Sequence, residues 1–270
     1  MKTCMLAGFL AVSLGIAPAQ QPSPAADSER EDFLLNAKVV RSRVVSTGIN
    51  RTQRVTLEYG AVTHDGHFND VSVAMKTFQG DRGTELNFKD DYKFNVAAYK
   101  LDRLIGLNMI PVYVERKVGG KSGALGWWVD DVQMMELDRH RKKIEPPDSA
   151  RWNDQMYQVR VFNELVYNVD PNLGNFLITK DWNVVMIDFT RAFRLHRTLR
   201  TPQNLTRVDR RVYDGLKKLN GDDVQRVAGN YLSKPEIQGV LARRERILDF
   251  FDKQIASKGE AAIICTSPGH

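Results

Sequence analysis

The sequence predicts an α+β protein of two lobes, with a β-rich N-terminal lobe that contains one helix and a mainly helical C-terminal lobe. Three observations lead to this fold class: short strand-like runs fill the first third, one helical period follows them, and helical periods dominate the second half. The chain has 270 residues, of which 42% are hydrophobic and 27% charged. This composition is typical of globular proteins and excludes a wholly disordered chain.

Strand patterns in the N-terminal lobe cover residues 38–47, 54–59 and 71–78, with turn signals at 48–50 and 60–66 between them. Residues 90–107 then carry apolar side chains at three- and four-residue steps, which indicates a helix. Two further strands at 112–118 and 125–132 flank a turn with two consecutive glycines. The turn composition favours an antiparallel hairpin here.

The C-terminal lobe follows a connector at residues 145–148. A helix is expected at 153–169, and two short apolar strands at 176–179 and 184–187 surround a four-residue turn. The expected helices that complete the lobe are 208–219, 222–232 and 235–256. Pro235 suits the first turn of the last of these helices, where a missing amide hydrogen costs nothing.

The first 19 residues read as a secretory signal peptide, with Lys2 before an apolar run and a small-x-small cleavage site at Ala17 to Ala19. The alternative, a transmembrane anchor, needs about 20 apolar residues. We therefore expect an exported, periplasmic or secreted protein with no transmembrane segment in the mature chain. Residues 20–37 would form a flexible leader, 38–138 the N-terminal lobe, 139–257 the C-terminal lobe and 258–270 a loose tail around Cys265, the one cysteine left after cleavage.

The net charge of +6 permits anionic partners but selects none of them. Residues 191–211 are rich in arginine, which indicates a solvated loop or, as the alternative, a region that recruits an acidic or phosphorylated substrate. Few aromatic residues are interleaved with these arginines, so no nucleic-acid partner is expected. His64 and His67 flank an Asp-Gly pair, and we interpret them as solvent-exposed imidazoles in a turn rather than as a metal site.

Three motifs stand in an order that suits phosphoryl transfer. Lys76 is the last residue of a Val-Ala-Met-Lys sequence on the predicted strand 71–78, and Asp170 and Asn175 have Asp-x4-Asn spacing. Asp188 opens an Asp-Phe-Thr motif 13 residues after Asn175. Phosphoryl transfer needs a cation for the phosphates, oxygen ligands for Mg²⁺ and a carboxylate that orients the acceptor hydroxyl. Each motif alone is more often structural, but their order and spacing together favour the functional interpretation.

Residues 162–193 and 97–116 resemble the core of atypical kinases related to the phosphatidylinositol 3- and 4-kinases and the HipA-type kinases. The resemblance implies a bilobal protein-kinase-like fold with ATP and Mg²⁺ in the cleft between the lobes. It implies that Asp170 is the catalytic residue, that Asn175 and Asp188 are the metal ligands, and that Lys76 binds the phosphates.

The sequence departs from this family pattern at three places. Pro171 stands where relatives carry an arginine, and Asn95 stands where a helix glutamate would pair with the phosphate-binding lysine. Asp91, one turn earlier on the same helical face, or Glu85, ahead of the helix, would replace that glutamate. Gly48 is the single glycine of a short phosphate-covering loop at 47–50.

These patterns predict an ATP- and Mg²⁺-dependent phosphotransferase that acts on an unidentified hydroxyl acceptor: a protein, a lipid or a small molecule. One alternative is a pseudokinase that binds nucleotide or protein without turnover. Another keeps the fold but transfers a nucleotidyl group.

Overall fold

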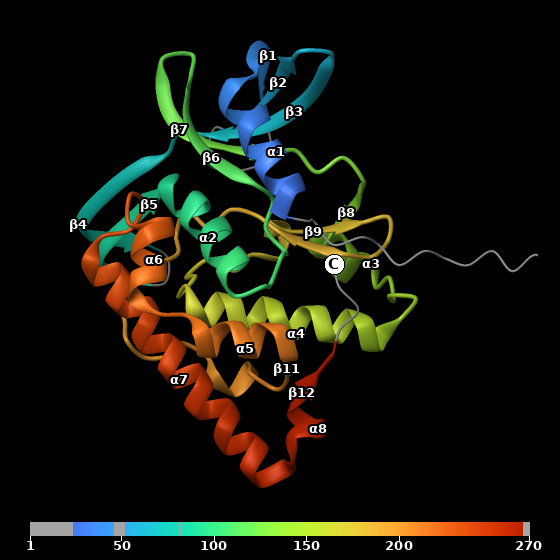
Figure 1. Cartoon of the computed structure of the whole chain (residues 1–270), viewed down its shortest axis with the longest axis vertical. Helices are drawn as coiled ribbons and strands as arrows, with labels where there is room; N and C mark the ends of the chain where they lie inside the picture. Colours follow the sequence, from blue (N-terminus) through green and yellow to red (C-terminus); the bar gives the residue numbers. More distant parts are fainter. Residues whose placement is uncertain (1–23, 46–51, 81–82, 267–270) are drawn as a thin grey trace, which may run out of the picture.

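The computed structural model describes residues 24–45, 52–80 and 83–266, which form an upper part built on β-strands and a lower part built on helices (Figure 1). This arrangement confirms the predicted α+β fold class with its β-rich N-terminal lobe and helical C-terminal lobe. No helix in the described part of the chain combines the length and apolar character that crossing a membrane requires.

A five-stranded antiparallel sheet forms the upper part, with the strand order β1-β2-β3-β7-β6. Its strands are β1 (Lys38–Val44), β2 (Gln53–Tyr59), β3 (Val62–Asn69), β6 (Tyr113–Val118) and β7 (Lys121–Trp127). β3 occupies the segment where the sequence indicates turns, and this interpretation was wrong. Gly66 pairs within the sheet, and the packing there leaves no room for a side chain: a Cβ would lie 2.7 Å from Leu125 and 3.2 Å from Leu57. Here glycine permits close packing within a strand rather than a turn.

A separate hairpin, β4 (Ser72–Gly80) and β5 (Gly83–Asp91), follows the sheet. The sequence predicts β4 but not β5, because the mostly polar residues of β5 show no alternation of apolar and polar side chains. The hairpin returns to the body of the protein through the Asp91 amide, which donates a hydrogen bond of 2.9 Å to the Thr190 carbonyl. This bond fixes the end of β5 beside the Asp-Phe-Thr motif.

Residues 24–36 form helix α1, although the composition of residues 20–37 indicates a flexible leader. The helix is held against α2 (Lys93–Leu104), because Arg103 lies 2.5 Å from Asp27 and Tyr99 donates a 2.7 Å hydrogen bond to Glu31. Phe33 and Leu34 are buried in the core. Tertiary packing therefore stabilises a helix that has almost no amphipathic signal of its own.

The lower part contains a three-stranded sheet of order β10-β9-β8 beneath the larger one, surrounded by helices. Its elements are β8 (Val132–Met135), α3 (Glu136–Lys142), α4 (Ser149–Leu165), η1 (Leu173–Asn175), β9 (Phe176–Thr179), β10 (Val184–Met186), η2 (Pro202–Asn204), α5 (Arg210–Lys218), α6 (Gly221–Ala228) and α7 (Lys234–Lys258). The predicted hairpin at 176–187 and the helix that begins near Pro235 both agree with this arrangement.

The last described residues are ordered rather than loose. They form α8 (Glu260–Ile263) and β12 (Ile264–Cys265), and β12 pairs in parallel with β11 (Val208–Asp209). Cys265 is buried as a result. The prediction of a loose tail missed this pairing, because a strand of two residues is too short to show a periodic pattern in the sequence.

The docking of α1 makes a testable prediction from two adjacent leucines. Leu34 is fully buried, whereas Leu35 is 48% exposed. Leu34→Ala should lower the free energy of unfolding by about 2–5 kcal/mol, because it leaves a cavity between α1 and the sheet. Leu35→Ala should change it by less than about 0.5 kcal/mol. Urea denaturation followed by circular dichroism measures both, and equal effects would mean that α1 does not dock as described.

Candidate functional site

The loop after α4 carries Asp170 and Asn175 and is shaped by its own hydrogen bonds. The Asn172 side chain accepts a 2.8 Å bond from the Gly174 amide, and the Asn175 amide donates 2.9 Å to the Asn172 carbonyl. These bonds form the single turn η1, which ends at Asn175 directly before β9. Asp170 keeps 41% of its side chain exposed, so its carboxylate is accessible from solvent.

Asp188 follows β10 and adopts the left-handed backbone conformation, with φ of 59°. Such a conformation is uncommon for a residue with a side chain and is found at functional sites. The Thr190 hydroxyl donates a 2.9 Å hydrogen bond to the Asp188 carboxylate. Phe189, the next residue, packs edge-on against Phe162 at 5.5 Å and anchors the motif in the core.

Backbone hydrogen bonds bring these three motif residues together. The Ile187 amide donates 3.0 Å to the Asn175 carbonyl, which places Asn175 beside the residue preceding Asp188. The Val169 amide donates 3.4 Å to the Arg191 carbonyl, which places the Asp170 loop beside the other end of the Asp-Phe-Thr motif. The structure thus assembles the sequence-predicted residues Asp170, Asn175 and Asp188 in one place.

The electrostatics of this place suit a cation. Burial raises the pKa of Asp188, and the carboxylates of Asp90 and Asp170 raise it further, against the lowering effect of the Thr190 hydrogen bond. One carboxylate oxygen of Asp90 is buried and accepts no hydrogen bond from the described residues. Negative charge is therefore concentrated here, and a bound divalent cation would neutralise it.

The protein ligands for such a cation are few. Among the described residues, no group of three or more His, Cys, Asp or Glu side chains is arranged to hold a metal ion. Asn175 and Asp188 could supply one amide oxygen and one carboxylate, the hard oxygen ligands that Mg²⁺ prefers. Mg²⁺ usually takes only one or two carboxylates from protein and completes its shell with phosphate and water, so this pair fits.

Asn95 on α2 has a structural contact with the motif. Its side-chain oxygen accepts a 2.7 Å hydrogen bond from the Phe189 amide, and the residue is fully buried. The amide nitrogen of the same side chain is buried and makes no hydrogen bond to the described residues. Asn95 therefore positions the Asp-Phe-Thr segment and does not serve as a charged partner for a lysine.

Lys76 lies exposed on β4, in the separate hairpin. Asp91 pairs with Ser72 in the hairpin register, four residues from Lys76, which is about 13 Å along a strand. The carboxylate of Asp91 accepts a 3.0 Å bond from the Lys93 amide and caps α2. The prediction that Asp91 pairs with Lys76 was therefore wrong: it assumed a helix from residue 90, whereas β5 runs to Asp91 in this structure.

Glu85, the other candidate partner of Lys76, is engaged elsewhere. Its carboxylate lies 2.5 Å from Arg194 and 3.3 Å from Arg191, so it ties β5 to the segment after the Asp-Phe-Thr motif. Gly48, predicted in the phosphate-covering loop, lies outside the described residues.

Arg191 is a site residue that the sequence analysis counted only as part of a basic run. Its guanidinium lies 3.8 Å from the Asp170 carboxylate and 5.1 Å from the centre of the Phe88 ring. An arginine thus contacts the Asp170 loop even though Pro171 occupies the position where relatives carry one. Its distance of 21 residues from Asp170 in sequence hid this contact.

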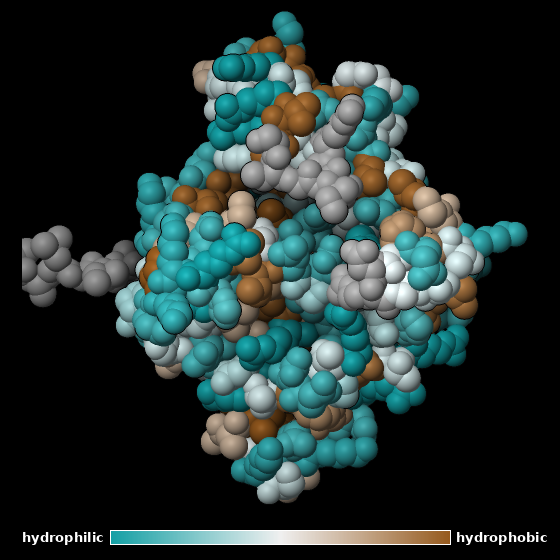
Figure 2. Space-filling view, turned by 180° about the vertical axis from the view of Figure 1, so that it is seen from behind, coloured by the Kyte–Doolittle hydropathy of each residue, from teal (hydrophilic) through white to brown (hydrophobic). Residues whose placement is uncertain are grey.

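A groove of about 1070 Å³ opens next to Asp170, between the β4–β5 hairpin and the segment after Asp188. Val169 and Arg191 are among its lining residues, and Leu86 and Leu195 are exposed apolar residues on its walls. A second view of the molecule shows a hollow at its centre lined largely by hydrophilic residues (Figure 2). The groove offers space for a second reactant near the segment that carries Asp170.

Most arginines of the basic run are paired within the fold. Besides the two that contact Glu85, Arg207 lies 3.4 Å from Asp154 and Arg211 lies 3.3 Å from Asp209. Arg200 donates a 3.2 Å bond to the Asn168 carbonyl. These contacts favour a structural role for the run over a free basic surface.

No protein-family model matches the sequence, and no curated protein matches it either. Solved structures do. The structure of hydra Fam20 with sugar has a TM-score of 0.65 at 15% identity, over 90% of this chain and 93% of that one. The Golgi casein kinase has a TM-score of 0.62 at 12% identity, over 91% and 79%. A Helicobacter pylori proinflammatory kinase, CtkA, has a TM-score of 0.52 at 8% identity, over 83% and 98%.

This chain has an atypical kinase-like fold. The predicted bilobal kinase-like architecture is thereby confirmed. The narrower relation to phosphatidylinositol 3- and 4-kinases and HipA-type kinases stays a prediction, because identities of 8–15% show the fold alone. The Golgi casein kinase has also been crystallised with Mn/ADP bound, with a TM-score of 0.62.

The crowding of carboxylates makes a prediction for Asp188→Asn. The substitution should weaken Mn²⁺ binding in the presence of ADP by more than about tenfold, since it removes the one carboxylate of the ligand pair. It should not lower the melting temperature of the metal-free protein, because it also removes repulsion from Asp90 and Asp170. Titration calorimetry and thermal denaturation measure the two effects. Asp131→Asn, at a carboxylate 74% exposed, is the control and should change neither.

Proposed function

We propose that this protein is an ATP- and Mg²⁺-dependent phosphotransferase that transfers the γ-phosphoryl group to a hydroxyl acceptor. The observation that carries the proposal is the hydrogen bond from the Ile187 amide to the Asn175 carbonyl, which brings the backbone of Asn175 next to the residue before Asp188 in a kinase-like fold. Kinases hold their metal ions with an Asn of the catalytic loop and the Asp of a later Asp-Phe-Gly motif.

The chain's residues divide the work of the transfer. Asp170 would accept the proton of the acceptor hydroxyl while the oxygen of that hydroxyl bonds to the γ-phosphorus. The bond between the γ-phosphorus and the oxygen that joins it to the β-phosphate breaks, and ADP leaves with that oxygen. Arg191, 3.8 Å from the Asp170 carboxylate, would orient this carboxylate. Lys76, exposed on β4, is our candidate for neutralising phosphate charge.

The cofactor assignment rests on the donor set. Asn175 and Asp188 would hold Mg²⁺, which when bound offsets the charge that develops on the transferred phosphoryl group. The concentration of negative charge around Asp188 supports a divalent cation here. The Golgi casein kinase binds Mn/ADP, which supports a nucleotide and a divalent metal for the same fold.

The acceptor would enter this groove, because its lining includes Val169, the residue before Asp170, and Arg191, which lies 3.8 Å from the Asp170 carboxylate. Its chemical class is left open: protein, lipid and small molecule all present hydroxyl groups. Neighbours of this fold include a casein kinase and a Fam20 structure with sugar, which supports both protein and carbohydrate acceptors as candidates for testing. Export by the N-terminal 19 residues stays a prediction, since they lie outside the described residues.

A non-catalytic role is the second candidate, favoured by Asn95. Where a kinase glutamate would pair with the phosphate-binding lysine, this chain has a neutral amide that bonds the Phe189 backbone. A neutral partner orients a lysine less strongly than a carboxylate does. A pseudokinase of this kind would bind nucleotide without releasing ADP. A nucleotidyl transferase would instead leave a nucleotide adduct on its acceptor, which mass spectrometry separates from a phosphoryl group.

Asp170→Asn tests the proposed base. The variant should bind ATP and Mg²⁺ as the wild type does but release ADP about 10²–10⁴-fold more slowly, because it cannot accept the hydroxyl proton. A coupled assay of ADP release, with water or added hydroxyl compounds as acceptors, measures the rate. The matched control is Asp181→Asn, at an exposed turn between β9 and β10. Wild-type turnover in Asp170→Asn contradicts the role of Asp170, and ATP binding without any turnover by the wild type supports the pseudokinase.

A further inference from the structure

The five-stranded sheet has two chemically different faces. The register places Arg54 of β2 opposite His67 of β3, His67 opposite Gly126 of β7, and Gly126 opposite Tyr113 of β6. Because residues directly opposite each other across an antiparallel sheet share a face, these residues form one row. The neighbouring row, on the opposite face, contains Phe68, Leu125 and Val114, which are all buried.

Helix α1 covers the apolar face. Arg116, on the same side of β6 as Val114, donates bonds of 2.6 and 3.0 Å to the Leu34 and Ala37 carbonyls at the end of α1. Phe33 of α1 contacts the rings of Trp127 and His64 edge-on. His64 therefore belongs to the face beneath α1, and the row that contains His67 is turned away from α1.

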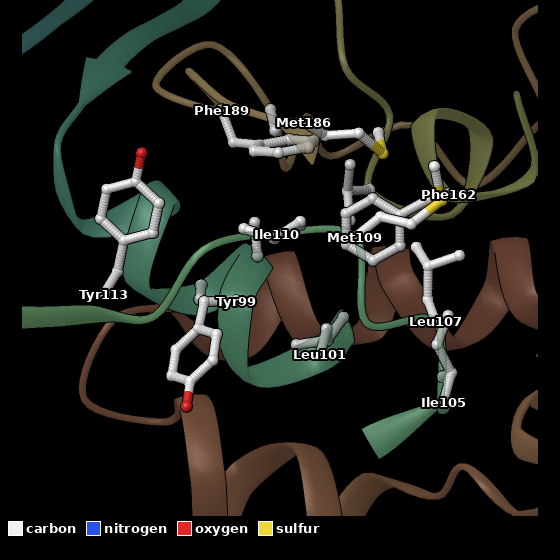
Figure 3. Packing of buried hydrophobic residues seen from close by; sticks show 14 of the residues in the cluster. Tyr99, Leu101, Ile105, Leu107, Met109, Ile110, Tyr113, Phe162, Met186 and Phe189 are labelled. Carbon is white, nitrogen blue, oxygen red and sulfur yellow. The ribbon is translucent and has the colours of Figure 1, made fainter. Parts of the chain in front are cut away.

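The polar row leads to the proposed metal ligands. Tyr113, at its end, is buried, and its pKa is raised by this burial and additionally by the negative charge of Asp188. In the close view of the core, the Tyr113 side chain extends to the side of β6 on which Phe189 lies, whereas Tyr99 extends the opposite way (Figure 3). The polar face of the sheet is therefore the roof over the Asp188 site.

His67 occupies the middle of this roof with an unused hydrogen-bonding atom. Its ring lies 6.4 Å from the Tyr113 ring at 81°, and its Nδ1 atom is buried without a hydrogen-bond partner in the described part of the chain. Burial lowers the pKa of His67 to about 4, so the imidazole is neutral at pH 7 and has one donor and one acceptor nitrogen. A buried nitrogen without a partner is costly, and a ligand at this position would remove the cost.

Arg54 adds a fixed positive charge next to His67. Its guanidinium lies 2.5 Å from the Asp65 carboxylate and 4.1 Å from the centre of the Trp128 ring. Asp65 lies on β3, within the roof, and Trp128 directly follows β7. The row thus combines a cation, a neutral imidazole and a phenol above a site that is otherwise acidic.

We propose that His67 is a nucleotide-binding residue that donates a hydrogen bond to the phosphate chain of ATP from the roof of the cleft. The inference rests on the proposed function, since it requires a nucleotide there. Phosphate is the fitting group because the row ends at Tyr113, on the side of β6 that faces the segment of Asp188, a proposed ligand of the Mg²⁺ that would accompany the phosphates. On this view a strand of the main sheet, and not only the separate hairpin with Lys76, contacts the phosphates.

The chain contains its own matched control for this role. His64 and His67 lie on the same strand but on opposite faces, and His64 is held by a 2.8 Å contact with Asp130 and by stacking on Trp127 at 3.8 Å. With ADP and Mg²⁺ as the probe in titration calorimetry, His67→Ala should weaken binding about tenfold, the worth of one hydrogen bond to a charged group. His64→Ala should change it less than about twofold. Adenosine, which has no phosphates, should bind wild type and His67→Ala alike.

The outcomes separate the inference from the function on which it rests. Normal ADP binding by His67→Ala, together with loss of binding in Asp188→Ala, overturns the role of His67 and leaves the phosphotransferase in place. Equal losses for ADP and adenosine overturn the assignment to phosphate. Absence of nucleotide binding by the wild type overturns both.

If His67→Ala fails to fold, ¹⁵N imidazole spectra of the wild type decide. Addition of ADP and Mg²⁺ should shift the His67 resonances and leave those of His64 unchanged. His67 resonances that do not shift overturn the inference.

Discussion

The site depends on one backbone hydrogen bond, from the Ile187 amide to the Asn175 carbonyl. Two chain segments that a hairpin separates meet at this bond, and each segment ends in a side chain with a hard oxygen ligand. The β9–β10 pairing and the turn at Asn172 set the approach of the two segments. Asp188 can then adopt its left-handed conformation because Phe189 is anchored by Phe162 on one side and Asn95 on the other. Neutral contacts thus fix the backbone geometry of this segment.

The core of this site could be predicted from sequence because its residues lie close together in the chain. Asp170, Asn175 and Asp188 fall within 19 consecutive residues, and the local strand-turn-strand pattern between them is readable. The lysine partner could not be predicted in this way. It depends on where β5 ends, and β5 is a polar strand whose pairing with β4 shows no alternation of apolar residues. Asp90 and Arg191 join the site through tertiary contacts alone, which no spacing in the sequence indicates.

The fold shows the same division between local and tertiary information. The helix over the middle of the chain, the β6–β7 hairpin and α7 carry strong periodic or turn signals, and the structure contains them all. α1 and β3 were missed because their stability comes from neighbours: α1 from its ion pairs with α2, and β3 from pairing on both edges. Glycine at position 66 reads as a turn in isolation, yet in the sheet it is the residue whose lack of a side chain lets Leu57 and Leu125 approach.

The pairing of β11 with β12 has a consequence for the order in which the molecule is completed. Val208 bonds beside Ile264, and the Arg207 side chain reaches the Ile264 carbonyl at 3.4 Å. The strand that precedes α5 therefore cannot acquire its partner until nearly all of the described chain has been synthesised. Contacts between residues so distant in sequence form late, because loop closure must come first. A nascent chain with a finished upper sheet would still present Val208 and Asp209 with an open edge until Ile264 and Cys265 have emerged to pair with them.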